Sequence, residues 1–134
     1  MITAVDSSVL LDLLTGDSRY ADDSESALRQ ARQEGGLILG ECVLAEIRPS
    51  LLGEGIFTFL EDLDLRFVPS TKESALLAGD YFRLYLKRGG QAKRVLPDFL
   101  IAAHAVSHAD RLLARDRGYL RDYFSDLKVF EPGA

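Results

Sequence analysis

Carboxylates stand at four positions in this 134-residue sequence where they could take part in chemistry: Asp6, Glu46, Asp98 and Asp116. Four acids close together would raise one another's pKa values unless cations lay between them. Mg²⁺ and Mn²⁺ prefer oxygen ligands and keep bound waters, and such ions can activate water against a phosphodiester. If the four acids converge, their chemistry is therefore metal-assisted phosphodiester hydrolysis without a covalent enzyme intermediate.

Asp98 has two readings. It follows Pro97, whose fixed φ suits the first turn of a helix, and a carboxylate there is favoured by the helix dipole. The next residues, Leu100–Ala105, are mostly small and apolar, so we expect this helix to lie in the core. Asp98 is thus either a simple helix-start charge or a metal or catalytic carboxylate, and the second reading requires partners elsewhere in the chain.

Five short apolar runs predict buried strands, and helical patterns separate most of them. The runs are Ile2–Val5, Leu37–Leu39, Leu65–Val68, Arg111–Ala114 and Lys128–Phe130. The predicted helices are one from Ser7 to the stop at Gly16, then Asp22–Glu34, Glu41–Arg48, Ile56–Leu63, one from Ser70 to Arg88, and one from Pro97. This alternation predicts an α/β fold of three layers, with a central, mostly parallel sheet of four to five strands.

The predicted elements would bring the acids to one edge of the sheet. Asp6 ends the first strand and Asp116 comes shortly after the fourth. Glu46 lies about a turn and a half into a helix, and could face back towards the preceding strand. Ligands of open α/β sheets bind outside the carboxyl ends of the strands, where the strand order switches. We therefore expect one acidic edge.

Capping chemistry is predicted at two helix starts. Ser7 and Ser8 offer N-cap hydroxyls to the first helix, and Ser70 with Glu73 has the spacing of a capping box. Asp12, further along the first helix, is interpreted as a solvated charge.

Composition indicates a single domain, residues 1–134, with 47% hydrophobic and 28% charged residues. No apolar run approaches the roughly 18 residues of a membrane span. The opening residues lack a basic segment, so we expect no signal peptide. Cys42 is the only cysteine, which excludes an internal disulfide and is typical of a reducing compartment. We expect a cytoplasmic protein with no membrane partner.

Charge is distributed unevenly along the chain, whose net charge is −5. From Arg83 to Arg121 there are nine Lys or Arg and only three Asp, so one face could hold a polyanion. Lys93 and Arg94 precede Asp98 and are candidates for contacting substrate phosphates. A solubilising loop would have the same composition.

The sequence resembles the PIN-domain family, and within it the VapC-type toxins, which are ribonucleases of toxin–antitoxin pairs. Four stretches carry the resemblance, in the family's order and spacing: Val5–Asp12, Val43–Ile47, Pro97–Ala103 and Leu112–Asp116. The likeness extends over essentially the whole chain. It implies a PIN-like fold and a metal-dependent endoribonuclease.

The resemblance also implies roles for particular residues. Asp6, Glu46, Asp98 and Asp116 would form an acidic quartet, with Asp6 and Asp98 as the principal ligands of Mg²⁺ or Mn²⁺. Ser7 would lie beside the pocket. Ala114 stands where such proteins often carry Thr or Ser, which favours one resting metal over two.

The resemblance further implies partners. RNA would be the substrate, with transfer RNA the favoured target. A VapB-type antitoxin would cover an apolar groove, for which Leu10, Leu13, Leu14 and the Ile56–Leu60 region are candidates. A homodimer through the helix that includes Tyr81–Arg88 is also implied.

Two other functions remain open from the sequence. One is a catalytically degenerate PIN-like binding module. The other is a HAD-like phosphohydrolase with Asp6 as nucleophile, although that class needs a second acid where this chain has Ser8. His104 and His108 share a helix face but lack a third zinc ligand, so we expect a surface or subunit-contact role.

Overall fold

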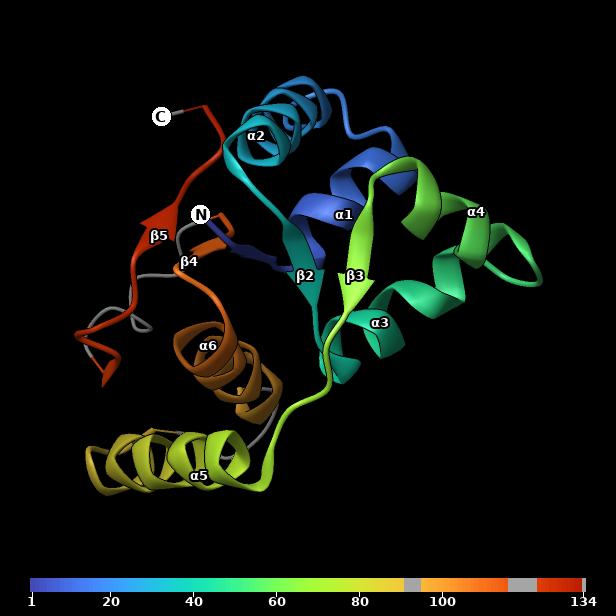
Figure 1. The fold of residues 1–134 in the computed structure, drawn as a ribbon. Coiled ribbons are helices and arrows are strands. Elements are labelled where there is room, and N and C mark those ends of the chain that lie inside the picture. Colours follow the sequence, from blue (N-terminus) through green and yellow to red (C-terminus); the bar gives the residue numbers. More distant parts are fainter. Residues whose placement is uncertain (91–94, 116–122, 134) are drawn as a thin grey trace.

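A five-stranded parallel sheet forms the centre of the molecule, in the strand order β3-β2-β1-β4-β5 (Figure 1). The computed structural model describes residues 1–90, 95–115 and 123–133. The strands are β1 (Thr3–Val5), β2 (Leu37–Leu39), β3 (Leu65–Phe67), β4 (Arg111–Leu113) and β5 (Val129–Phe130). All five predicted strands are confirmed, and the expected mostly parallel sheet pairs in parallel at all four of these junctions.

Helices connect the strands. In chain order they are α1 (Ser7–Thr15), α2 (Ala21–Glu34), α3 (Glu41–Ile47), the 3₁₀ turn η1 (Arg48–Ser50), α4 (Gly55–Asp62), α5 (Lys72–Lys87) and α6 (Leu96–His108). The predicted helix positions are confirmed to within a few residues. No helix within the described ranges combines the length and the apolar character needed to cross a bilayer.

The strand order explains the three layers. The chain runs from β1 to β2 to β3 in one direction and then returns across the sheet to β4, on the other side of β1. Because parallel crossovers are right-handed, the helices of the outward and return paths cover opposite faces. Helices α5 and α6 pack together on the return face, with α6 against β1 and β4 (Figure 1). The switch in strand order therefore falls between β1 and β4.

The core is made by the strands and the inward faces of α1 and α6. Its largest fully buried side chains include Val9 and Leu10 on α1, Ile38 on β2, Phe99 on α6 and Leu112 on β4. The small residues of α6 let it lie close to the sheet: Ala102 and Ala103 are completely buried. The prediction of a core helix after Pro97 is confirmed.

Both predicted caps are wrong in detail. Asp6, not Ser7 or Ser8, caps α1, because β1 ends at Val5 and leaves Asp6 in extended geometry before the helix. At the start of α5 the capping box joins Thr71 and Ser74 instead of Ser70 and Glu73. The helix begins one residue later than the sequence spacing suggested.

Candidate active site at the switch point of the sheet

Asp6 lies where the strand order switches. Its backbone N–H donates to the carbonyl of Leu113 at 2.9 Å, which holds Asp6 against the end of β4. Its carboxylate accepts hydrogen bonds from the backbone N–H of Ser8 at 3.2 Å and from the Ser8 hydroxyl. Asp6 is only 3% exposed. A buried carboxylate at the switch point of a parallel sheet occupies the usual ligand position of such folds.

Ser7 joins Asp6 to Glu46. The Ser7 hydroxyl donates to Oε1 of Glu46 at 3.1 Å, which links the first turn of α1 to the last turn of α3. The Glu46 side chain therefore faces the start of α1, just after the end of β1. Glu46 is exposed to solvent, so this edge is open on the side of α3.

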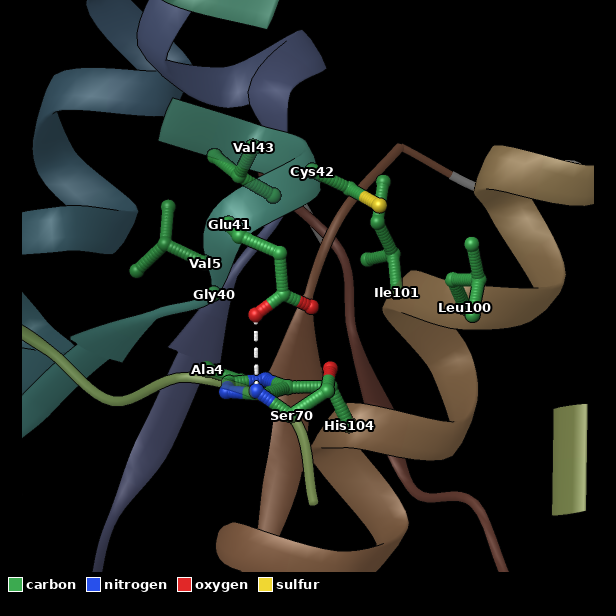
Figure 2. Close-up of a pocket in the computed structure, with 10 residues that line it drawn as sticks. All are labelled: Ala4, Val5, Gly40, Glu41, Cys42, Val43, Ser70, Leu100, Ile101 and His104. Carbon is green, nitrogen blue, oxygen red and sulfur yellow. Dashed lines mark hydrogen bonds between the residues drawn. The ribbon is translucent and has the colours of Figure 1, made fainter. Parts of the chain in front are cut away.

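Asp98 approaches the same edge from the other face of the sheet. It lies in the first turn of α6 and is 9% exposed. One turn later, Ile101 lines a small pocket together with Val5 at the end of β1 and Val43 on α3 (Figure 2). Because α6 runs back along the sheet into β4, Asp98 lies one turn nearer the carboxyl edge than Ile101. Asp98 thus lies in the turn of α6 nearest the edge where Asp6 follows β1.

The remaining predictions for this site fall on residues that the structure does not describe. Asp116, Lys93 and Arg94 lie outside the described ranges. Ala114 is described: it is buried, and its N–H donates to the carbonyl of Phe130 at 3.1 Å.

The donors present fit a hard divalent cation. Asp6, Asp98 and Glu46 offer carboxylate oxygens and Ser7 a hydroxyl, the donor chemistry that Mg²⁺ and Mn²⁺ prefer. Among residues 1–90, 95–115 and 123–133, no three His, Cys, Asp or Glu side chains form a group that could hold a metal ion. A magnesium site commonly uses one or two carboxylates, with waters and substrate phosphates completing its shell. Two buried carboxylates are enough for that arrangement.

The small pocket beside this edge lies where α3, α6 and the loop before α5 pack together (Figure 2). Its volume is about 10 Å³, roughly the space of one water. His104 hydrogen-bonds through Nε2 to the carbonyl of Val68 at 2.6 Å, and Glu41 accepts from the Ser70 N–H at 2.7 Å. Both bonds fix the loop between β3 and α5. The predicted surface role of His104 is wrong, because this side chain is 4% exposed and fills the core side of α6.

Burial governs the ionisation of the groups around this pocket. It lowers the pKa of His104, although the bond to Val68 acts in the opposite direction. Burial raises the pKa of the Cys42 thiol, and the nearby Glu41 and Glu46 carboxylates raise it further. A thiol with a raised pKa is a poor nucleophile, so Cys42 is unsuited to nucleophilic chemistry.

Asp12 was interpreted as a solvated charge, and this prediction is wrong. Asp12 is 3% exposed and accepts a hydrogen bond from the Ser24 hydroxyl at 2.8 Å. Its other oxygen lies 3.1 Å from the guanidinium of Arg115, which also covers the ring of Tyr20. A sequence signal existed: Asp12 follows Val9 by three residues, which places both on the buried face of α1.

An apolar groove lies between α3, α4 and β3, away from the acidic edge. Its volume is about 390 Å³, and its apolar lining residues are Leu44, Ala45, Ile56, Phe57, Leu60 and Phe67. Phe57 is 61% exposed and Phe67 44%, which is unusual for phenylalanine side chains. Within the predicted groove region Ile56–Leu60, Phe57 is therefore exposed, whereas Ile56 is buried at 4% exposure. Leu10 is completely buried and cannot contact a partner there.

Comparison with solved structures finds the same fold in structures named VapBC and FitAcB. The chain resembles a chain of VapBC2 from Rickettsia felis bound to promoter DNA, with 16% identity, a TM-score of 0.75 and 98% of both chains covered. It resembles VapBC-1 from nontypeable Haemophilus influenzae at 18% identity and a TM-score of 0.70, again over 98% of both chains. FitAcB from Neisseria gonorrhoeae gives 21% identity and a TM-score of 0.67, over 97% of this chain and 96% of that chain.

Sequence comparison supplies the family. Among curated proteins, no sequence matches this chain. The sequence model of the PIN domain matches residues 3–124, which include all four predicted acids. With that match and the parallel sheet that carries Asp6 at its switch point, the chain belongs to the PIN domain family.

Proposed function

We propose that this protein is a metal-dependent endoribonuclease that hydrolyses RNA phosphodiester bonds. The observation that carries the proposal is the buried carboxylate of Asp6 at the switch point, with Glu46 linked to Ser7 beside it and Asp98 in the first turn of α6. PIN domains are generally nucleases, which agrees with this chemistry.

Each residue has a distinct part in the proposed reaction. Asp6 and Asp98 would hold Mg²⁺ or Mn²⁺, while Glu46 and Asp116 would complete the shell or orient water. When bound, the ion supplies charge that polarises the phosphodiester and lowers the pKa of the attacking water. Ser7 holds Glu46 in place through its hydrogen bond.

Substrate contacts would extend outwards from the acids. Lys93 and Arg94, next to the α6 start in sequence, are proposed to contact RNA phosphates. Transfer RNA is the favoured target because of the resemblance to VapC-type toxins. A HAD-like reaction is disfavoured because Ser8 occupies the position of the required second acid and hydrogen-bonds to Asp6.

Cleavage assays with a single matched pair of variants test the proposal. We expect purified protein to cut labelled single-stranded RNA and transfer RNA with Mg²⁺ or Mn²⁺, and to stop in EDTA. Asp98→Asn should abolish cutting, since it keeps the size of the side chain but removes its charge. Asp80→Asn removes an exposed carboxylate from the middle of α5 and should cut like the unmodified protein.

The contrary result would identify the alternative function. No cutting of any RNA, together with no Mn²⁺ binding in calorimetry, would leave a PIN-like binding module. Equal activity of Asp98→Asn and the unmodified protein would remove Asp98 from the site.

We also propose that the protein is the toxin of a VapBC-type pair. Solved structures of the same fold are complexes named VapBC and FitAcB. The groove lined by Phe57, Leu60 and Phe67 offers an apolar surface of the kind that an antitoxin helix would cover. Co-expression with a candidate VapB-type antitoxin should give a stable complex, and Phe57→Asp should weaken it. Retention of full affinity by Phe57→Asp would place the antitoxin elsewhere.

A homodimer that uses helix α5 and its surroundings is proposed by the same resemblance. Sedimentation velocity over a range of concentrations tests it. A single species at the mass of one chain throughout would exclude the dimer.

A further inference from the structure

A basic side chain lies on an aromatic ring close to the start of α6. The guanidinium carbon of Arg88 is 5.0 Å from the centroid of the Tyr123 ring. Arg88 caps the C-terminal end of α5 and is exposed, while Tyr123 is half-buried. The Arg88 cation therefore lies at the surface and covers one face of the Tyr123 ring.

The Tyr123 ring packs against two other aromatic rings. Its centroid is 5.6 Å from the Phe99 ring and 6.0 Å from the Tyr85 ring. Phe99 is completely buried, so it anchors this cluster to the core. An aromatic ring fixed in this way has one face on the protein and can offer the other to a planar ligand.

The same cluster is continuous with the candidate active site. Phe99 follows Asp98 directly in the first turn of α6, so the ring that supports Tyr123 neighbours a predicted metal ligand. The end of α5 that carries Arg88 is also the end that leads into α6. A polymer bound at Asp98 would pass close to the Arg88–Tyr123 pair.

The local charge suits a polyanion. Arg83, Lys87 and Arg88 are all exposed within the last turns of α5. Within the described part of the chain, none of these three cations forms an ion pair with a carboxylate. This end of α5 therefore carries a local excess of positive charge, although the whole protein carries a net charge of −5.

We propose that Arg88 and Tyr123 bind one nucleotide of single-stranded RNA beside the acidic edge. Arg88 turns from the ring to a backbone phosphate, and the unpaired base takes its place on Tyr123. The exchange is favourable because an exposed cation–π contact is weaker than a base stacked on an aromatic ring. Bases inside a duplex are already stacked, so this contact selects unpaired RNA. The inference rests on the proposed nuclease function and names its substrate class.

Binding can be measured without cleavage, which separates this inference from the nuclease proposal. A fluorescein-labelled single-stranded RNA is titrated with the full chain in EDTA, and its anisotropy is recorded at several salt concentrations. We expect Arg88→Gln to weaken binding at least about fivefold and to reduce the salt slope by roughly 0.7. Arg83→Gln removes the same charge from a different face of α5 and should leave both quantities unchanged.

Tyr123 variants test the stacking separately from the charge. Tyr123→Leu should weaken binding of the single strand at least about fivefold while the salt slope stays the same. Tyr123→Phe keeps the ring and should bind like the unmodified protein, which also guards against a folding defect. A duplex of the same sequence should bind Tyr123→Leu and the unmodified protein equally.

The outcomes are distinguishable. Equal losses for Arg83→Gln and Arg88→Gln, or unchanged affinity in both Arg88→Gln and Tyr123→Leu, would overturn the inference. If such variants also cut RNA normally in an Asp98-dependent reaction, the nuclease proposal would stand alone. Selective loss of binding in a protein that cuts no RNA would support this contact and overturn the nuclease instead.

Discussion

Arg115 and Asp12 form an ion pair that joins the end of β4 to the middle of α1. The guanidinium nitrogen of Arg115 lies 3.1 Å from Oδ1 of Asp12. Ser24 on α2 donates to the other oxygen of the same carboxylate at 2.8 Å. The Asp12 side chain therefore connects two helices of one layer to the strand beside the switch point.

Asp12→Asn should destabilise the protein by about 2 kcal/mol, because it leaves the Arg115 cation without its buried partner. The 38% exposure of the Arg115 side chain keeps the loss below that of a fully buried pair. Urea unfolding followed by circular dichroism would measure a lower midpoint with an unchanged m-value. Asp80→Asn, on the exposed face of α5, is the matched control, and an equal midpoint for the two variants would refute the prediction.

Sequence patterns predicted the sheet well because each buried strand is a short apolar run that can be recognised without knowing its tertiary partners. Leu37–Leu39 is apolar and bounded by glycines, and it forms β2 with the predicted bounds. The core helix after Pro97 was predicted equally well. Its first-turn acid indicates a helix start, and its small apolar residues indicate burial. The site edge followed from these elements, because strand ends and helix starts place Asp6 and Asp98.

Tertiary partners could not be read in the same way. Asp12 differs from a solvated helix charge only through Arg115 and Ser24, which lie on other elements. His104 is buried because the carbonyl of Val68, before α5, accepts its hydrogen bond. In both cases the partner that stabilises the buried side chain is distant in sequence. Local periodicity alone therefore does not predict the burial of these polar residues.

The start of α5 offers a local stability prediction. The Thr71 hydroxyl accepts from the Ser74 N–H at 3.1 Å, while the Ser74 hydroxyl accepts from the Thr71 N–H at 3.0 Å. Thr71→Ala removes one half of this reciprocal cap and should cost about 1 kcal/mol of unfolding free energy. Thermal unfolding checks the loss. Ser70→Ala serves as the control, because the bond to Glu41 uses the Ser70 backbone N–H.

His104 makes stability depend on pH. Burial lowers its pKa in the folded state, so protonation favours the unfolded chain, in which His has its ordinary pKa of about 6.5. The contribution is fully present above that value and is lost as the pH falls through the lower pKa of the folded state. The nearby groups act in opposite directions: His108 lowers the pKa of His104, while Glu41 and the Val68 carbonyl raise it.

His104→Gln provides the comparison, since its amide can still donate to Val68 but does not titrate. Urea midpoints of both proteins are measured between pH 7.5 and 5.5. We expect the unmodified protein to lose more stability over this range than His104→Gln. Parallel pH profiles would show that His104 is not the group responsible.

The Ser7 hydroxyl offers a test of whether Glu46 takes part in metal binding. This hydroxyl donates a hydrogen bond of 3.1 Å to the exposed carboxylate of Glu46 and so helps to orient it. Outer groups that orient metal ligands typically contribute about 10-fold to 100-fold in metal affinity or activity. Ser7→Ala should therefore raise the Mn²⁺ concentration needed for half-maximal RNA cleavage by about 10-fold.

The control lies on the same helix. Thr15 at the end of α1 donates its hydroxyl to the Leu11 carbonyl, far from the acidic edge, so Thr15→Ala should leave the Mn²⁺ requirement unchanged. A Ser7→Ala protein that keeps its thermal stability but needs more Mn²⁺ would place Glu46 in the metal shell. If the Mn²⁺ requirement does not change and Glu46→Gln still cuts RNA, Glu46 lies beside the site but takes no part in catalysis. Asp6 and Asp98 would then bind the ion with fewer protein ligands.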